Sequence, residues 1–192
     1  MNAAGTSTTG WRVFPPLVWT ILVGTLLMRT AFFMVWPFLA IILEREFHLS
    51  PSQIGTILST AFLSSAFVGF YAGAISDRYG RQPVILAGCV GAIGAYALLA
   101  VASNVLAYTI GAFMVGFTRS MLEPPSKALI ADHIADQRRR DLAFHARYFL
   151  INVDGAVGPL VGLAFGLSAQ QETFWLTAVA YVVFAVAFCI TL

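Results

Sequence analysis

The chain has 192 residues, of which 59% are hydrophobic and only 10% are charged, and its net charge is +2. Globular domains carry about 25% charged residues, so this composition excludes an ordinary water-soluble domain. The mean hydropathy of +0.82 is typical of a protein that crosses a membrane several times. No basic run is interleaved with aromatic residues, so nucleic acid is not an expected partner.

A polar segment of about ten residues precedes the first apolar run. This run extends from Val13 to Leu43 and contains one charged residue, Arg29. A signal-peptide core has only about 7–15 apolar residues, so the run predicts an uncleaved first span.

Six apolar runs are long enough to cross about 30 Å of hydrocarbon at 1.5 Å per residue. Ser103 and Asn104 are the only break in a 37-residue uncharged run, residues 82–118, which predicts a tight hairpin there. Ser50 and Pro51 are expected to cap and begin the second span. The sequence therefore predicts an all-α membrane protein with one domain, residues 1–192. Its spans are expected at 17–43, 52–75, 83–102, 105–131, 143–167 and 172–192.

Basic residues fall mainly on one side of the predicted membrane, and Arg45 stands on the other side. The positive-inside rule then places both termini in the cytoplasm. We interpret the triple arginine at 138–140 as a determinant of topology, and a site for anionic lipid is the alternative. The residues assigned to the cytoplasmic side are Arg12, Arg78, Arg81, Lys127, Arg138, Arg139, Arg140 and Arg147.

Four charged residues fall inside the predicted hydrocarbon zone: Arg29, Arg119, Glu123 and Asp154. A charge at that depth costs about 2.5–3.5 kcal/mol or more, so each is expected to face a partner or a water-filled cavity. Arg119 and Glu123 are four residues apart and within reach of each other on one helix face. Arg119 and Asp154 lie at similar depth on neighbouring spans that run in opposite directions.

These charges have two interpretations. They are static ion pairs that hold helices in register, or one carboxylate, Asp154 or Glu123, binds and releases a proton. Burial favours the protonated form of a carboxylate and an approaching arginine favours the ionised form, which is the competition that a proton-coupled switch needs. Asp154 lies deeper by sequence count and is the preferred candidate.

One face of the first span carries Phe32, Phe33, Trp36 and Ala40 beside Arg29. An aromatic-lined cavity with a buried cation can bind large apolar or amphipathic molecules by stacking. Lipid-facing side chains are the alternative interpretation of these aromatic residues.

Prolines and small residues add structural expectations. Trp36-Pro37 and Pro124-Pro125 predict kinks. Glycines recur four residues apart, at Gly69 and Gly73 and again at 158, 162 and 166, which predicts close helix packing. Residues 168–172 form a second small polar turn.

The turn between the second and third spans reads Gly-Ala-Ile-Ser-Asp-Arg-Tyr-Gly-Arg over residues 73–81. This Gly-x-x-x-Asp-Arg-x-Gly-Arg pattern resembles the signature loop between helices 2 and 3 of the major facilitator superfamily of transporters. In that family the loop pairs with charged helix ends to latch the inner side of the protein. The residues that carry this resemblance are Gly73, Asp77, Arg78, Gly80 and Arg81, and Asp132 resembles the acidic partner expected for Arg81.

Within this latch, Gly73 and Gly80 are expected to allow close helix approach and a tight turn. Asp77 is expected to end the helix, with Arg78 and Arg81 at the cytoplasmic surface.

A second motif spans residues 152–162. Through Gly158, Pro159 and Gly162 it resembles the helix 5 motif of the drug/proton antiporter branch of the superfamily. Asp154 stands where that motif has glycine, and Leu163 replaces its last glycine. The segment at 123–129 most resembles multidrug efflux members.

The resemblance implies the N-terminal six-helix half of a major facilitator fold, built as two inverted three-helix repeats. It implies a secondary active transporter, or its N-terminal half, in a bacterial plasma membrane. The expected activity is alternating-access movement of small amphipathic or drug-like molecules, as export coupled to proton entry. No cofactor is expected, and the proton gradient is the driving force.

The expected partners are the lipid bilayer, a small-molecule substrate, and a second half that completes the cavity. That half is a missing C-terminal half of a longer transporter, which we favour, or a second copy of the chain in a parallel homodimer.

Alternative functions remain at this point. One is a uniporter or symporter for sugars or other nutrients, and another is a non-transporting fragment or assembly partner. An intramembrane enzyme would need a catalytic or metal centre at membrane depth, but His48, His133 and His145 fall at membrane edges. Cys89 and Cys189 lie deep in apolar runs, so we expect no catalytic residue, metal site or disulfide.

Overall fold

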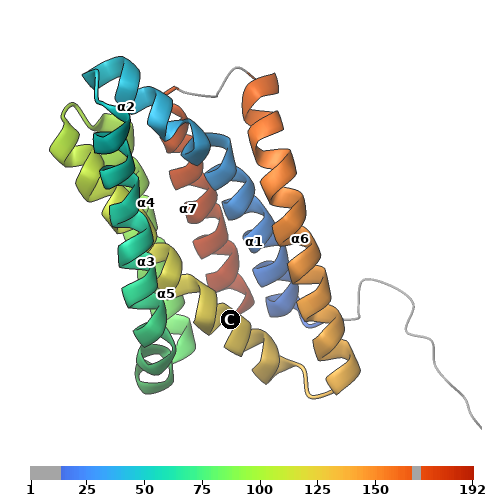
Figure 1. Ribbon diagram of the computed structural model, residues 1–192. Coiled ribbons are helices and arrows are strands. Elements are labelled where there is room, and N and C mark those ends of the chain that lie inside the picture. The colour runs from blue at the N-terminus through green and yellow to red at the C-terminus, as the bar shows by residue number, and fades with distance from the viewer. Residues whose placement is uncertain (1–13, 166–169) are drawn as a thin grey trace, which may run out of the picture.

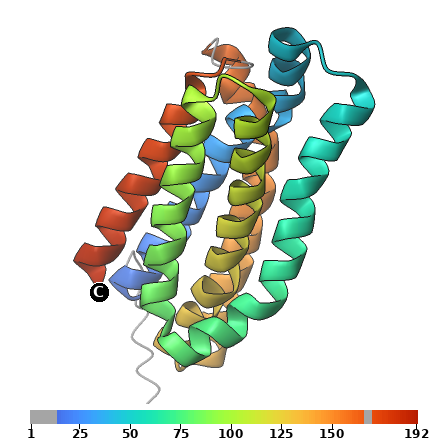
Figure 2. The ribbon, with the colours of Figure 1, turned by 90° about the vertical axis from the view of Figure 1, so that its left-hand side faces the viewer.

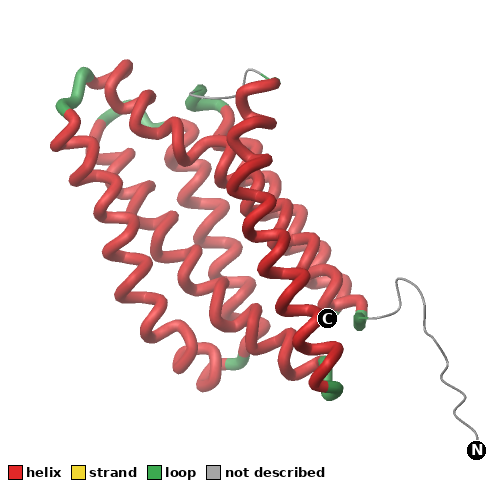
Figure 3. The backbone as a smooth tube through the Cα atoms, turned by 45° about the vertical axis from the view of Figure 1, so that its right-hand side comes forward, coloured by secondary structure: helices red, strands yellow, loops and turns green. Residues whose placement is uncertain are grey.

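The computed structural model describes residues 14–165 and 170–192, and Figure 3 shows these parts as helices joined by short turns, without a strand. The all-α prediction is confirmed. The elements are α1 (Pro16–Val35), the 3-10 turn η2 (Trp36–Phe38), α2 (Leu39–Phe47), α3 (Pro51–Tyr79), α4 (Arg81–Val101), α5 (Val105–His133), α6 (Gln137–Ala164) and α7 (Thr173–Thr191).

Five of the six expected spans are long and apolar enough to cross a membrane: Pro16–Phe47, α3, α4, α5 and α7. The 28 residues of α6 also exceed about 30 Å in length. Its charges, which include Arg147 and Asp154, lower its hydropathy, so its membrane crossing stays a prediction. Arg12, Gly166 and parts of the expected fifth span and second polar turn lie outside the described residues.

Capping residues set the ends of several helices. Ser50 and Gln53 form a reciprocal capping box at the start of α3, with Pro51 in the first position, as expected. Asn104 accepts a hydrogen bond of 2.9 Å from the Ala107 backbone and begins α5 after the predicted hairpin. Gly80, at φ 92°, makes the tight turn between α3 and α4.

The kink predicted at Trp36-Pro37 is confirmed, because the α-helix gives way there to the 3-10 turn η2. Proline lacks the N–H that would continue the ladder, and its ring crowds the preceding turn. Pro124 and Pro125 lie inside α5, which remains helical from Val105 to His133.

The helices interleave along the chain. α3 and α4 both pack on α5, whereas α1 packs on α6 and α7, and an α4–α7 contact joins the two groups. Figures 1 and 2 show α3 at one edge of the bundle and α6 on the far side of α1. α5 and α6, although consecutive, make little direct contact. α1 likewise makes few contacts with α3 and α5, which leaves room between these three helices.

Loops with the basic residues share one end of the bundle. The start of α1, the α3–α4 turn, the α5–α6 connection and the C-terminus lie at the lower end in Figure 1, and α2 and the α4–α5 hairpin lie at the upper end. This arrangement agrees with one basic face, and the assignment of that face to the cytoplasm stays a prediction.

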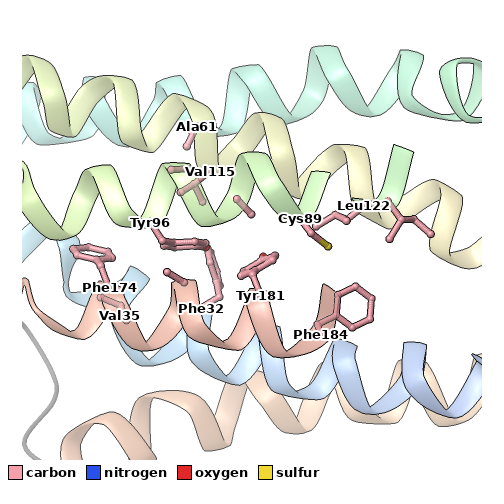
Figure 4. Close-up of a cluster of buried hydrophobic side chains, with 14 of the residues drawn as sticks. Phe32, Val35, Ala61, Cys89, Tyr96, Val115, Leu122, Phe174, Tyr181 and Phe184 are labelled. Atoms are coloured by element: carbon pink, nitrogen blue, oxygen red, sulfur yellow. The ribbon is translucent and has the colours of Figure 1, made fainter. Parts of the chain in front are cut away.

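A buried aromatic cluster joins the two helix groups. Tyr96 of α4 and Tyr181 of α7 stack with ring centroids 5.5 Å apart, and Figure 4 shows them with Phe174 and Phe184 of α7 in the same buried cluster. All four side chains are buried. This contact holds α4 against α7.

Two glycines permit close approach between helix backbones. A Cβ added at Gly158 would lie 2.5 Å from the Phe33 Cβ and 3.1 Å from the Thr30 carbonyl oxygen, across the α1–α6 contact. A Cβ at Gly116 would collide with the Ala61 carbonyl of α3. The same role was predicted for Gly73, where a Cβ would meet no atom of another described helix within 4 Å, so that role stays a prediction.

Gly158→Ala should lower the free energy of unfolding by about 1–3 kcal/mol, because a backbone carbonyl and a Cβ cannot move aside cheaply. Thermal unfolding of the detergent-solubilised protein measures this. Gly155→Ala is the matched control on the same helix, since its Cβ would meet nothing within 4 Å. Equal stability of the two variants would contradict the close packing.

Candidate functional site

A cavity of about 530 Å³ lies between α1, α3 and α5. Its volume falls in the range of about 300–1,000 Å³ that is usual for small-molecule sites. Four of the predicted residues of the first span line it, and Ala40 does not. The lining residues are Arg29, Phe32, Phe33, Trp36, Ala61, Phe62, Ser65, Val115, Gly116, Arg119, Ser120 and Glu123.

Both cavity arginines lie against aromatic rings of α1. The Arg29 guanidinium is 5.5 Å from the ring centroid of Phe33, and that of Arg119 is 4.4 Å from the centroid of Phe32. Phe32 in turn stacks on Trp36 at 5.2 Å. Such cation–π contacts contribute about 0.5–2 kcal/mol each and keep the cations beside apolar surface. The cavity therefore offers aromatic faces and positive charge together.

Asp154 is fully buried at the α1–α6 contact, behind the cavity wall. Thr30 Oγ1 donates a hydrogen bond of 2.8 Å to its Oδ1, and Arg29 Nε lies 3.5 Å from its Oδ2. Depth alone suggested Arg119 as a partner, but α6 packs against α1 and has little contact with α5. The carboxylate therefore pairs with the arginine of α1.

Glu123 forms two ion pairs, neither of them with Arg119. Its Oε1 accepts from Arg147 Nη1 at 2.9 Å and lies 3.2 Å from Lys127 Nζ. The expected contact between Arg119 and Glu123 is wrong for a physical reason. A glutamate four residues before a cation, as with Lys127, is the favourable order along a helix, whereas Arg119 precedes Glu123. Within residues 14–165 and 170–192, no carboxylate lies within ion-pair distance of Arg119.

Arg147 is the functional candidate that sequence reasoning missed. It was assigned to the basic loop, yet it lies inside α6 and is only 4% exposed. Its position within the predicted span 143–167 could have indicated that Arg147 lies at membrane depth. Arg147 ties α6 to Glu123 of α5, across the open side of the bundle.

The signature loop places its charges as the resemblance implies. Arg81 contacts Asp132, donates a hydrogen bond of 2.7 Å to the Ala128 carbonyl and lies 3.9 Å from Asp77. Asp77 does not end its helix, because α3 continues to Tyr79 and Gly80 breaks it. The role of these contacts as a latch stays a prediction.

In the second motif, Gly158 and Gly162 are buried and Pro159 lies inside α6. Of these three described residues, Gly158 lies in close contact with the α1 backbone.

A bundle of membrane-length helices with a cavity lined by aromatic and charged side chains is the arrangement expected of a transporter. The sequence matches the Major Facilitator Superfamily over residues 21–192, and the chain belongs to that family. It is therefore an integral membrane protein of a transporter family and not an enzyme.

Several curated relatives are similar to most of the chain. The uncharacterized MFS-type transporter YqjV of Bacillus subtilis is 36% identical over 89% of the chain and 42% of its own length. A Na(+), Li(+), K(+)/H(+) antiporter of Planococcus maritimus is 31% identical over 82% of the chain and 38% of its own length. The multidrug resistance protein MdtH of Klebsiella pneumoniae is 26% identical over 83% of the chain and 39% of its own length.

Among solved structures, the POT family transporter PepTSo superposes with a TM-score of 0.80 at 20% identity, over 92% of this chain and 37% of that one. This likeness shows the fold, which is half of a major facilitator bundle. The chain spans about two-fifths of the length of the relatives it matches.

Glu123→Gln should lower the free energy of unfolding by about 2 kcal/mol, because it leaves the buried Arg147 without its carboxylate. Fully buried pairs lose about 3–5 kcal/mol on such a change and exposed pairs about 0.2–1 kcal/mol, and Glu123 is 36% exposed. Asp132→Asn removes a more exposed pair and should cost less than about 1 kcal/mol. Denaturant or thermal unfolding of both variants checks the order, and a reversed order would contradict it.

Proposed function

We propose that the protein is the N-terminal half of a secondary active transporter that exports small amphipathic molecules in exchange for protons. One observation carries the proposal. Arg29 belongs both to the cavity wall, beside Phe33, and to the buried contact with Asp154. A change at Asp154 therefore reaches the binding surface through a single side chain.

The cavity supports amphipathic cargo. Phe33 and Trp36 supply flat apolar surface, and Ser65 and Ser120, which hydrogen bond to each other at 2.5 Å, supply a polar patch on the opposite wall. An apolar ring can stack on the aromatic side while a polar group faces the serines.

Proton exchange follows from the Arg29 position. An ionised Asp154 attracts Arg29 and holds it toward α6. A proton on Asp154 removes that attraction, so Arg29 is free to move further over the aromatic surface, where it competes with a bound molecule. Proton binding and cargo binding are then mutually exclusive, as exchange requires.

Two relatives have names that agree with parts of this proposal: a multidrug resistance protein and a cation/proton antiporter. We also propose that a second six-helix half completes the pathway, because the relatives are more than twice as long as the chain. That half is either a further segment of the same protein or a second copy in parallel orientation, and crosslinking in a bilayer distinguishes them.

A nutrient uniporter or symporter is the second candidate within transporters, and a non-transporting assembly partner is the candidate of another class. A uniporter would move cargo without regard to a pH gradient, and an assembly partner would move none.

Transport in proteoliposomes with an imposed pH gradient tests the coupling. The gradient should drive accumulation of an amphipathic cargo, and Asp154→Asn should abolish accumulation while leaving downhill exchange. Glu123→Gln is the companion variant, since Glu123 is the other carboxylate of the zone. Accumulation that persists after both carboxylates are replaced, or that does not depend on the pH gradient, would contradict the proposed proton coupling.

Trp36→Ala should weaken binding of an aromatic amphipath by about tenfold, because one large stacking surface is lost. Equilibrium binding of a fluorescent amphipath measures the change. Trp175→Ala is the matched control, since Trp175 lies half-exposed on α7 and does not line the cavity. The same loss in both variants would argue against cargo on the α1 face.

A further inference from the structure

A small recess adjoins the main cavity and is lined by three arginines from three helices. Its volume is about 40 Å³, and its wall includes Arg29, Arg119, Arg147 and Glu123 together with Ser126 and Tyr181. Arg29, Arg119 and Glu123 also line the main cavity, so the two spaces share these side chains as a common wall. The proposed transport function does not use this recess.

Positive charge exceeds negative charge around the recess. Its three arginines face one carboxylate, Glu123, which already pairs with both Arg147 and Lys127. The nearest further carboxylate, Asp154, pairs with Arg29. Four cationic side chains thus share two carboxylates, and Arg119 has neither of them. A buried cation without a counter-charge is costly, so an anion is expected where these groups converge.

Two donors of these arginines are unsatisfied in the described parts of the chain. Arg29 Nε and Arg147 Nε are both buried and neither has a hydrogen-bond acceptor. Arg29 Nε lies 3.5 Å from Asp154 Oδ2, which is near enough for charge attraction, but no hydrogen bond joins them and Oδ2 likewise has no hydrogen-bond partner among the described residues. Arg147 is only 4% exposed, so bulk water does not satisfy its Nε donor. A buried donor without an acceptor costs about 1–3 kcal/mol.

We propose that the recess binds one monovalent anion, held by Arg29, Arg119 and Arg147. A water-sized probe needs about 10–15 Å³ of such volume, and a chloride ion is only slightly larger than water, so a single small anion fits in the recess. The anion offsets the charge of Arg119 and offers an acceptor to the guanidinium groups that line the recess. It leaves the aromatic surface of the main cavity free.

Two sources can provide this charge: a free halide, or the acid group of a molecule whose apolar part lies in the main cavity. Both present one negative charge with lone pairs to guanidinium N–H groups. The experiment has one arm for each source, and neither arm depends on transport.

Thermal unfolding of the purified protein is compared in sodium chloride and sodium gluconate at equal ionic strength, since gluconate is too large for the recess. Chloride should raise Tm saturably, by about 5 °C at a concentration well above its Kd. In the second arm, 2-naphthoate is added in gluconate buffer beside its neutral amide, 2-naphthamide. A rise in Tm with naphthoate alone assigns the site to the acid group of a bound molecule.

Arg119→Gln should remove the anion effect, and Arg138→Gln, an exposed arginine at the start of α6, should retain it. If Arg119→Gln fails to fold, saturable binding of radioactive chloride and of labelled naphthoate to the unaltered protein replaces it.

A saturable effect of either anion that is lost in Arg119→Gln supports the site. Equal stability in every anion, an effect that survives Arg119→Gln, or the absence of saturable binding of both probes overturns it.

Discussion

The contact between Arg29 and Asp154 is the interaction on which the cavity depends. Asp154 is fully buried, so its charge must be balanced within the bundle, and Arg29 is the cation that α1 brings to it. Gly158 lies one turn further along α6 and allows the α1 backbone to come close enough for Thr30 to donate to the same carboxylate. Gly158, a small residue that permits helix packing, therefore also sets the geometry around the buried carboxylate of Asp154.

A second tie, between Glu123 and Arg147, spans the open side of the bundle. α5 and α6 have little contact elsewhere, so this ion pair is a local constraint on their separation. The cation–π contact of Arg119 with Phe32 adds a third link, between α5 and α1. The walls of the cavity are thus held by polar and aromatic side chains, whereas α4 and α7 are held by the buried rings of Tyr96 and Tyr181. Side-chain contacts of the first kind can exchange partners without unpacking the core.

Much of the architecture was predictable from the sequence. Hydropathy located five spans, because an apolar run of bilayer length is typical of a transmembrane helix. The helix cap at Ser50 and the helix break at Pro37 follow from the local chemistry of these residues. The four charges of the hydrocarbon zone were also identified, since their cost is a property of depth alone. These features need no knowledge of which helices touch.

Partner choice was not predictable in the same way. The four-residue spacing predicted a pair between Arg119 and Glu123, and similar depth predicted a pair between Arg119 and Asp154. In the structure α6 packs on α1, so Asp154 pairs with Arg29, and Glu123 pairs with Arg147. Arg147 was counted with the basic residues of the preceding connection, and only the structure shows it buried inside α6. Gly73 and Gly116 look alike in sequence, and only Gly116 meets another backbone.

The resulting distribution of charge bears on how exchange can work. Arg147 pairs with Glu123 and Arg29 pairs with Asp154, whereas Arg119 has no carboxylate within ion-pair distance in the described parts of the chain. An anion held by all three arginines, as proposed above, would offset the charge of Arg119 and would compete with Asp154 for Arg29. In the proposed exchange, protonation of Asp154 would shift Arg29 away from α6, and because Arg29 lines the cavity this movement would change the cavity wall.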